Sequence, residues 1–178
     1  MNIFSELGDA SHQASSMSQF HNSLCTTRDD RALKTLARSI SLSKHRFSLT
    51  FVRCDRAYPQ SLALRLLRDR YNLAPEVLEL PNNTQQLYSL VRKSQSACDA
   101  DASFCLFILG LNNVTHLDEL LISINQTRNE FQQNFSFPIV LWVNDDIIKK
   151  LIKLAPDFYN WASAPISLGY PSAEVLVF

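Results

Sequence analysis

The sequence predicts an α/β fold in which a mostly parallel sheet lies between two layers of helices, a three-layer sandwich. Short runs of β-branched and aromatic residues alternate along the chain with amphipathic segments of about ten to twenty residues. Such alternation is typical of right-handed β–α–β crossovers. The chain has 178 residues, of which 46% are hydrophobic and 19% charged, enough to close one core. We therefore expect one α/β domain over residues 28–178, preceded by a flexible or loosely docked segment, 1–27.

The first half of the chain is expected to alternate helices with strands. Leu33, Leu36 and Ile40 recur at helical spacing after a polar start, and residues 47–53 alternate apolar and polar side chains in the manner of a strand. Pro59 suits the first turn of a helix. The expected elements are a helix ending near Ser43, a strand at 47–53, a helix from Pro59 to Tyr71, a strand at 76–80 and a helix from Asn83 or Thr84 to about Cys98.

The second half contains the most apolar run of the chain, residues 103–109, which predicts a central strand buried on both faces. Gly110 ends this strand. The expected elements that follow are a long helix from about Thr115 to Asn134, a buried strand at 139–143, a helix capped by Asn144 or Asp145 and running to Leu154, a short aromatic helix at 158–161 and a terminal strand at 173–178.

Charge and cysteine usage limit the possible partners and compartment. Lys and Arg number 17, as do Asp and Glu, so the formal net charge is zero, which opposes a dedicated nucleic-acid binder or an electrostatic membrane anchor. The four cysteines form no C-x-x-C pair, so we expect reduced structural thiols, with no metal and no cofactor. The first residues have no basic segment followed by an apolar one, which favours a cytoplasmic location.

Ligands of an open parallel sheet bind beyond the carboxyl ends of its strands, so these ends are the candidate sites. The loop after the first strand, residues 54–61, has neither glycine nor lysine, and the whole chain has three glycines, so a phosphate-cradling loop is not expected there. Arg56 could bind one phosphate, although a lone arginine is more often a solvated surface residue. Asp55 could act as a reactive carboxylate, although it also suits a helix start.

Two further strand ends carry polar side chains. Asn112 follows the central strand and could orient a ligand, but it is a poor sole partner for magnesium. Asp145 and Asp146 follow the strand at 139–143 and could be paired carboxylates of an acid–base site or metal ligands. We favour their alternative role in the first turn of the next helix, where anions are stabilised by the helix dipole. His116 is expected to be solvated in the first turn of a helix.

The aromatic cluster Phe158, Tyr159 and Trp161 also has two interpretations. Large aromatic side chains usually close the edge of a core, which is the interpretation we favour. They could instead form an exposed patch that docks a protein partner.

Three segments resemble a known family. Residues 124–131 (INQTRNEF), 137–143 (FPIVLWV) and 155–161 (APDFYNW), together with the turn Gly110-Leu111-Asn112, resemble the N-terminal NTPase-like domain of bacterial, notably cyanobacterial, multidomain proteins that carry tetratricopeptide or WD repeats. The resemblance covers residues 47–161 and implies a P-loop-NTPase-like sheet of the signal-transducing STAND type, in which the phosphate loop is often eroded. It also implies protein partners or adjacent repeat domains.

This chain departs from the family where charge would matter. Asn112 stands in place of the usual acid and Ala162 in place of a common arginine, while Tyr159 replaces the usual tryptophan. No catalytic residue is carried over. Because family members continue into repeats, the chain is either a fragment truncated at its C-terminus or a stand-alone relative.

The expected function is that of a non-catalytic, degenerate NTPase-like module for protein–protein interaction or signalling, without a role for nucleic acid or membrane. The alternative is a nucleotide-binding or hydrolysing domain with an unorthodox loop, in which Arg56 contacts phosphate and Asp145 or Asp146 holds a metal. A third hypothesis is a phosphate-ester or other small-molecule enzyme with Asp55 as its reactive group.

Overall fold

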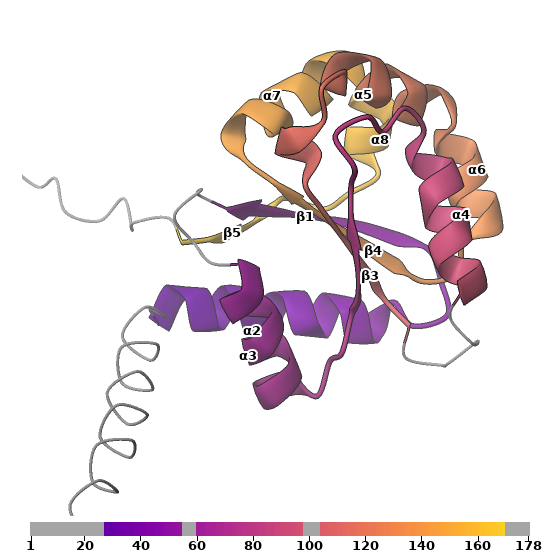
Figure 1. Ribbon diagram of the computed structural model, residues 1–178. Helices are drawn as coiled ribbons and strands as arrows, with labels where there is room; N and C mark the ends of the chain where they lie inside the picture. Colours follow the sequence, from indigo (N-terminus) through magenta and orange to yellow (C-terminus); the bar gives the residue numbers. More distant parts are fainter. Residues whose placement is uncertain (1–26, 55–59, 98–103, 170–178) are drawn as a thin grey trace, which may run out of the picture.

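The computed structural model describes residues 27–54, 60–97 and 104–169, and these residues form a five-stranded parallel sheet with helices on both faces (Figure 1). The strand order is β2-β3-β4-β1-β5, and every paired neighbour is parallel. The predicted class, a three-layer α/β sandwich of P-loop-like type, is confirmed.

The bounds of the elements follow the predicted alternation closely. In chain order they are α2 (Thr27–Leu42), β1 (Ser48–Cys54), α3 (Gln60–Tyr71), β2 (Glu76–Glu79), α4 (Leu87–Ala97), β3 (Leu106–Leu109), the 3₁₀ turn η1 (Leu111–Asn113), α5 (Leu117–Gln126), α6 (Arg128–Asn134), β4 (Pro138–Val143), α7 (Asp145–Leu154), α8 (Pro156–Asn160) and β5 (Ile166–Leu168). Among the described residues, no helix combines the length and apolar character needed to cross a bilayer.

The sheet separates two cores because successive side chains of a strand point to opposite faces. On one face, Val52 of β1 and Phe107 of β3 pack with the buried stripe of α2 and with α3. On the other face, Phe51 and Ile108 pack beneath α4, α5, α6, α7 and α8. Figure 1 shows this asymmetry: of the described helices, α2 and α3 lie below the sheet and the others above it. β3 and β4 are buried along their whole length, as expected of central strands in a parallel sheet.

Four details differ from the sequence prediction. The helix expected to begin at Asn83 or Thr84 begins at Leu87. The helix expected over 115–134 is two helices, which meet at Thr127. The strand expected over 103–109 begins only at Leu106. A strand not anticipated, β5, pairs with Val52–Cys54 of β1. The expected N-terminal segment, except for Thr27, and the terminal strand at 173–178 lie outside the described residues.

Candidate functional site at the carboxyl edge of the sheet

The parallel sheet brings the carboxyl ends of β1, β3 and β4 to one edge, where the candidate residues were sought. Of these, Asp55 and Arg56 lie in the interval 55–59, outside the described residues. Asn112 lies in η1 directly after β3, and Asp145 is the first residue of α7 directly after β4. The described part of the edge is therefore formed by Asn112 and Asp145, and by a residue of β1 that the sequence analysis did not single out.

That residue is Arg53, which forms a bidentate ion pair with Asp145. Its Nε donates to Oδ1 of Asp145 and its Nη2 donates to Oδ2 at 2.8 Å. The sheet register explains the encounter, because Arg53 pairs with Val143, two residues before Asp145. The Arg53 and Asp145 side chains keep 38% and 43% of their surface exposed, so the pair lies at the rim of the edge.

Asp145, the first residue of α7, is thus paired with Arg53 of β1. Asp146 instead faces Lys149, whose Nζ lies 3.5 Å from Oδ1. The cap of α7 is Asn144, whose Oδ1 accepts a hydrogen bond from the backbone N–H of Ile147 at 2.9 Å. The two aspartates therefore occupy the first turn of α7, where each contacts a different cation.

The turn after β3 depends on Gly110. Its φ of +86° lies in the left-handed region, and a Cβ at this position would lie 3.3 Å from the backbone N and O of Leu80. The turn directs Asn112 to the surface, where its Nδ2 donates to Oδ1 of Asn113 at 2.9 Å. The amide that could orient a ligand is thus exposed, and it contacts its neighbour in the chain.

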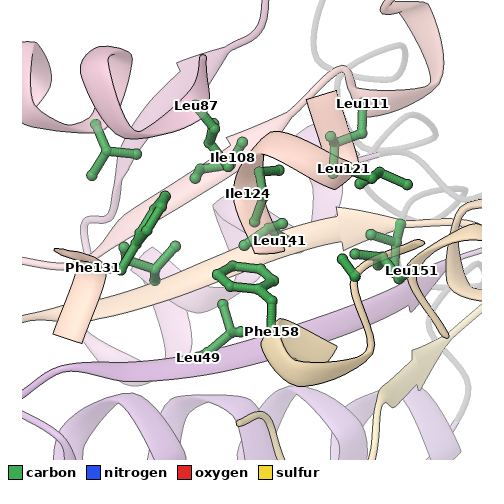
Figure 2. Close-up of a cluster of buried hydrophobic side chains, with 14 of the residues drawn as sticks. Leu49, Leu87, Ile108, Leu111, Leu121, Ile124, Phe131, Leu141, Leu151 and Phe158 are labelled. Atoms are coloured by element: carbon green, nitrogen blue, oxygen red, sulfur yellow. The ribbon is translucent and has the colours of Figure 1, made fainter. Parts of the chain in front are cut away.

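The aromatic cluster is placed mainly in the core. Phe158 is fully buried, and Figure 2 shows its ring turned inward among Leu49, Leu141 and Ile124. Tyr159 is partly buried and stacks on Phe51 with ring centroids 5.3 Å apart. Trp161, also partly buried, meets Phe47 edge-on at 6.0 Å. Phe158 is therefore a packing residue, whereas Tyr159 and Trp161 retain some surface.

A polar hollow of about 390 Å³ lies beside the first half of β1, away from the carboxyl edge. Ser48 and Thr50 line it together with Gln132, Trp161 and Ser163. It lies beside the earlier residues of β1, which no strand of the described residues pairs with on the side of β5, because β5 pairs with Val52–Cys54. Hydroxyl, amide and indole groups of this kind suit a small neutral polar molecule.

The two described cysteines, Cys54 and Cys105, are buried. Burial raises the pKa of Cys105 to about 11 and outweighs the opposing effect of the Lys44 charge. His116 precedes α5 and is exposed, with Nδ1 3.6 Å from a carboxylate oxygen of Glu119. No group of three or more His, Cys, Asp or Glu side chains that could hold a metal occurs within the described ranges.

Arg53 is the functional candidate that sequence reasoning missed. The signal that could have found it is a charged side chain inside an otherwise apolar strand, FSLTFVR. Its partner lies 92 residues further along the chain, so the pairing becomes visible only with the strand register. The chain matches no protein-family model and no curated protein sequence.

Proposed function

We propose that the domain is a non-catalytic, degenerate NTPase-like module that acts in protein–protein interaction or signalling. The observation that carries the proposal is the Arg53–Asp145 ion pair. An NTPase sheet uses a carboxylate at a strand end to hold a metal and a cation to hold phosphate. In this chain a carboxylate and a cation at the edge neutralise each other through two hydrogen bonds.

Two further features support the same proposal. Asn112, the polar side chain that follows the central strand, is uncharged and contacts Asn113. The loop after β1, residues 55–59, contains no glycine to bring backbone amides around a phosphate and no lysine to reach it. The resemblance to the N-terminal domains of repeat-containing signalling proteins supports the interaction half of the proposal.

The direct test is calorimetric titration of the whole chain with ATP and GTP in the presence of Mg²⁺, together with thermal shift. A ligand at 100 times its dissociation constant would stabilise the fold by about 2.7 kcal/mol, a shift of several degrees. We expect no saturable heat and no shift for either nucleotide. Asp145→Asn is the matched variant, because it removes the carboxylate charge that faces Arg53 and so shows whether this pair is what keeps a phosphate out.

The rival function, a nucleotide-binding domain with an unorthodox loop, predicts the opposite outcome. In that case wild-type protein binds nucleotide and Arg56→Ala abolishes the binding. Turnover of nucleotide or of a phosphate ester that disappears in Asp55→Asn would instead identify an enzyme. Either result would overturn the proposed non-catalytic role.

A further inference from the structure

The neutral overall charge conceals a concentration of positive charge in one helical layer. Residues 27–46 and 60–71, which contain α2 and α3, carry nine of the 17 basic residues and three of the 17 acidic ones. The rest of the chain carries the compensating acidic excess. Since α2 and α3 are the described helices on their side of the sheet in Figure 1, the positive charge of these segments is concentrated on one layer.

The cations of this layer point outward because the apolar stripes of both helices face the sheet. In α2, Leu33, Leu36 and Ile40 are buried, which directs the opposite side of the helix to solvent. In α3 the buried residues are Leu62, Ala63, Leu66 and Leu67. Five cations lie on the outward sides and are exposed, and we call them the basic face. They are Arg31, Lys34, Arg38, Arg65 and Arg68.

No carboxylate of the described residues neutralises the basic face. Within residues 27–54, 60–97 and 104–169, none of its five cations forms an ion pair. Of the aspartates on the two helices, Asp29 is buried and accepts from the N–H of Gly169, and Asp30 pairs with Arg70. Asp69 is the remaining one and is exposed.

In the opposite helical layer, three cations contact carboxylates of the described residues. There Lys150 pairs with Asp118 across α7 and α5, and Arg128 lies 3.4 Å from Asp157. Lys149 faces Asp146 within α7. Three cations of that layer thus contact carboxylates, whereas among the described residues the five cations of the basic face direct their charge toward solvent.

An apolar side chain accompanies the cations. Leu42 is 63% exposed at the end of α2, the most exposed of the large hydrophobic residues described. It follows Arg38 by four residues, so it continues the stripe of Arg31, Lys34 and Arg38 along the helix. The stripe from Arg31 to Leu42 is about 16 Å long at the α-helical rise.

From this arrangement we infer that the outer surface of α2 and α3 binds an acidic protein segment that places carboxylates against the basic face and one apolar side chain against Leu42. A nucleic acid fits less well, because its phosphates offer nothing apolar to Leu42 and the exposed side of the two helices presents no aromatic ring for base stacking. A membrane surface would need more than one apolar anchor beside the cations. This inference rests on the proposed interaction function and specifies the surface and the chemistry of its partner.

The test measures fluorescence anisotropy of a labelled acidic peptide of about 15 residues, rich in Glu and Ala with one central Leu, added to the whole chain at low and at physiological salt, roughly 50 and 150 mM. We expect saturable binding that weakens as salt rises. The triple variant Arg31→Gln, Lys34→Gln, Arg38→Gln should weaken binding about tenfold, because three exposed ion pairs are lost.

The matched control removes three charges from α7 instead, with Lys149→Gln, Lys150→Gln and Lys153→Gln. It changes the net charge equally, and it should alter the affinity by less than about twofold if the local surface, rather than total charge, binds the peptide. Leu42→Ser should weaken binding about fivefold and leave the salt dependence unchanged, because it removes an apolar contact only. Arg31, Lys34, Arg38 and Leu42 are exposed, so the α2 variants should keep the wild-type thermal midpoint. Lys150 is partly buried and pairs with Asp118, so the midpoint of the control variant is measured beside its affinity.

Four results would overturn the inference. The first is failure of the wild-type chain to bind the peptide, and the second is an equal loss of affinity in the two triple variants. The third is tighter binding of a DNA duplex or of phosphatidylserine vesicles with an affinity that Leu42→Ser does not change. The fourth is self-association of the chain that the α2 variant abolishes. The nucleotide titration reports on a different edge of the molecule. Absence of peptide binding together with absence of nucleotide binding would therefore refute this surface and leave the non-catalytic proposal standing.

Discussion

Truncating Phe158 should destabilise the domain severely, because α8 holds its place over the sheet mainly through this ring. Phe158 is fully buried, and its centroid lies 5.6 Å from that of Phe131 and 6.4 Å from that of Phe51, both in edge-to-face geometry. Its backbone N–H also donates to Oδ1 of Asn125 at 3.1 Å, which fixes the start of α8 against α5. Phe158→Ala removes the ring and leaves a cavity, at a cost of about 3–5 kcal/mol.

The assay is urea unfolding followed by circular dichroism, at matched protein concentration. With an m-value of about 2 kcal/mol per molar, the midpoint should fall by roughly 2 M. Phe158→Leu refills most of the space and should cost about 1–2 kcal/mol, so it keeps the prediction measurable if the alanine variant does not fold. Ile152→Ala is the control, since Ile152 is 51% exposed on α7 and its truncation should cost less than about 1 kcal/mol. Equal losses for Phe158→Ala and Ile152→Ala would refute the core assignment.

Three further predictions concern the strand ends and the buried thiol. Asn144→Ala removes the cap of α7 and should lower the free energy of unfolding by about 1 kcal/mol in urea titrations, whereas Asn144→Gly should cost only a few tenths. Gly110→Ala should cost about 1–3 kcal/mol by thermal unfolding, because alanine is strained at a φ of +86° and its Cβ would press on the backbone of Leu80; an unchanged midpoint would contradict this. For Cys105, the folded thiol keeps its proton to about pH 11 while the unfolded thiol loses it near 9.0, so stability should fall between these two values as pH rises. The loss, about 2–3 kcal/mol, should be absent from Cys105→Ala in urea melts repeated across that range.

The sheet was predictable because each of its main strands is a local run of residues with a matching burial pattern. The segment Pro138–Val143 is apolar at every position and is buried at every position, as a central parallel strand requires. The alternation of β1 likewise agrees with a strand whose two faces contact different helices. The apolar runs and their alternation involve residues that are adjacent in the sequence, so they can be recognised without the structure.

The break between α5 and α6 was not predicted, because the hydrophobic period continues across it. Leu121, Ile124 and Phe131 keep helical spacing across the break, so periodicity indicates one helix. The structure shows that the Thr127 hydroxyl donates to the carbonyl of Ser123 at 2.9 Å, a backbone contact that bends helices. β5 was missed because three residues, Ile166–Leu168, are too few to show a period.

The candidate site was predicted only in part. Placing Asp145 at the start of a helix required knowledge of its neighbours, which the sequence supplies. Recognising that Arg53 neutralises it required the pairing of β1 with β4, which depends on the whole topology. The basic face was not predicted for a different reason. The equal totals of 17 basic and 17 acidic residues do not reveal that positive charge is concentrated on one helical layer.

The position of β1 in the sheet also sets the timing of folding. β1 is the first strand of the described residues, yet its partners there, β4 and β5, belong to the last third of the chain. During synthesis about 90 residues separate the emergence of Ser48 from that of Pro138, which corresponds to roughly 5 to 20 s at ordinary elongation rates. Throughout that interval the backbone N–H and C=O groups of β1 lack the hydrogen bonds that β4 provides in the folded sheet, and its apolar side chains are not covered from that side. β2 and β3 can pair before β4 is made, but β1 can join the sheet only after the ribosome has finished β4. Until then, packing against α2 is the contact that can cover the side chains of β1 on one face.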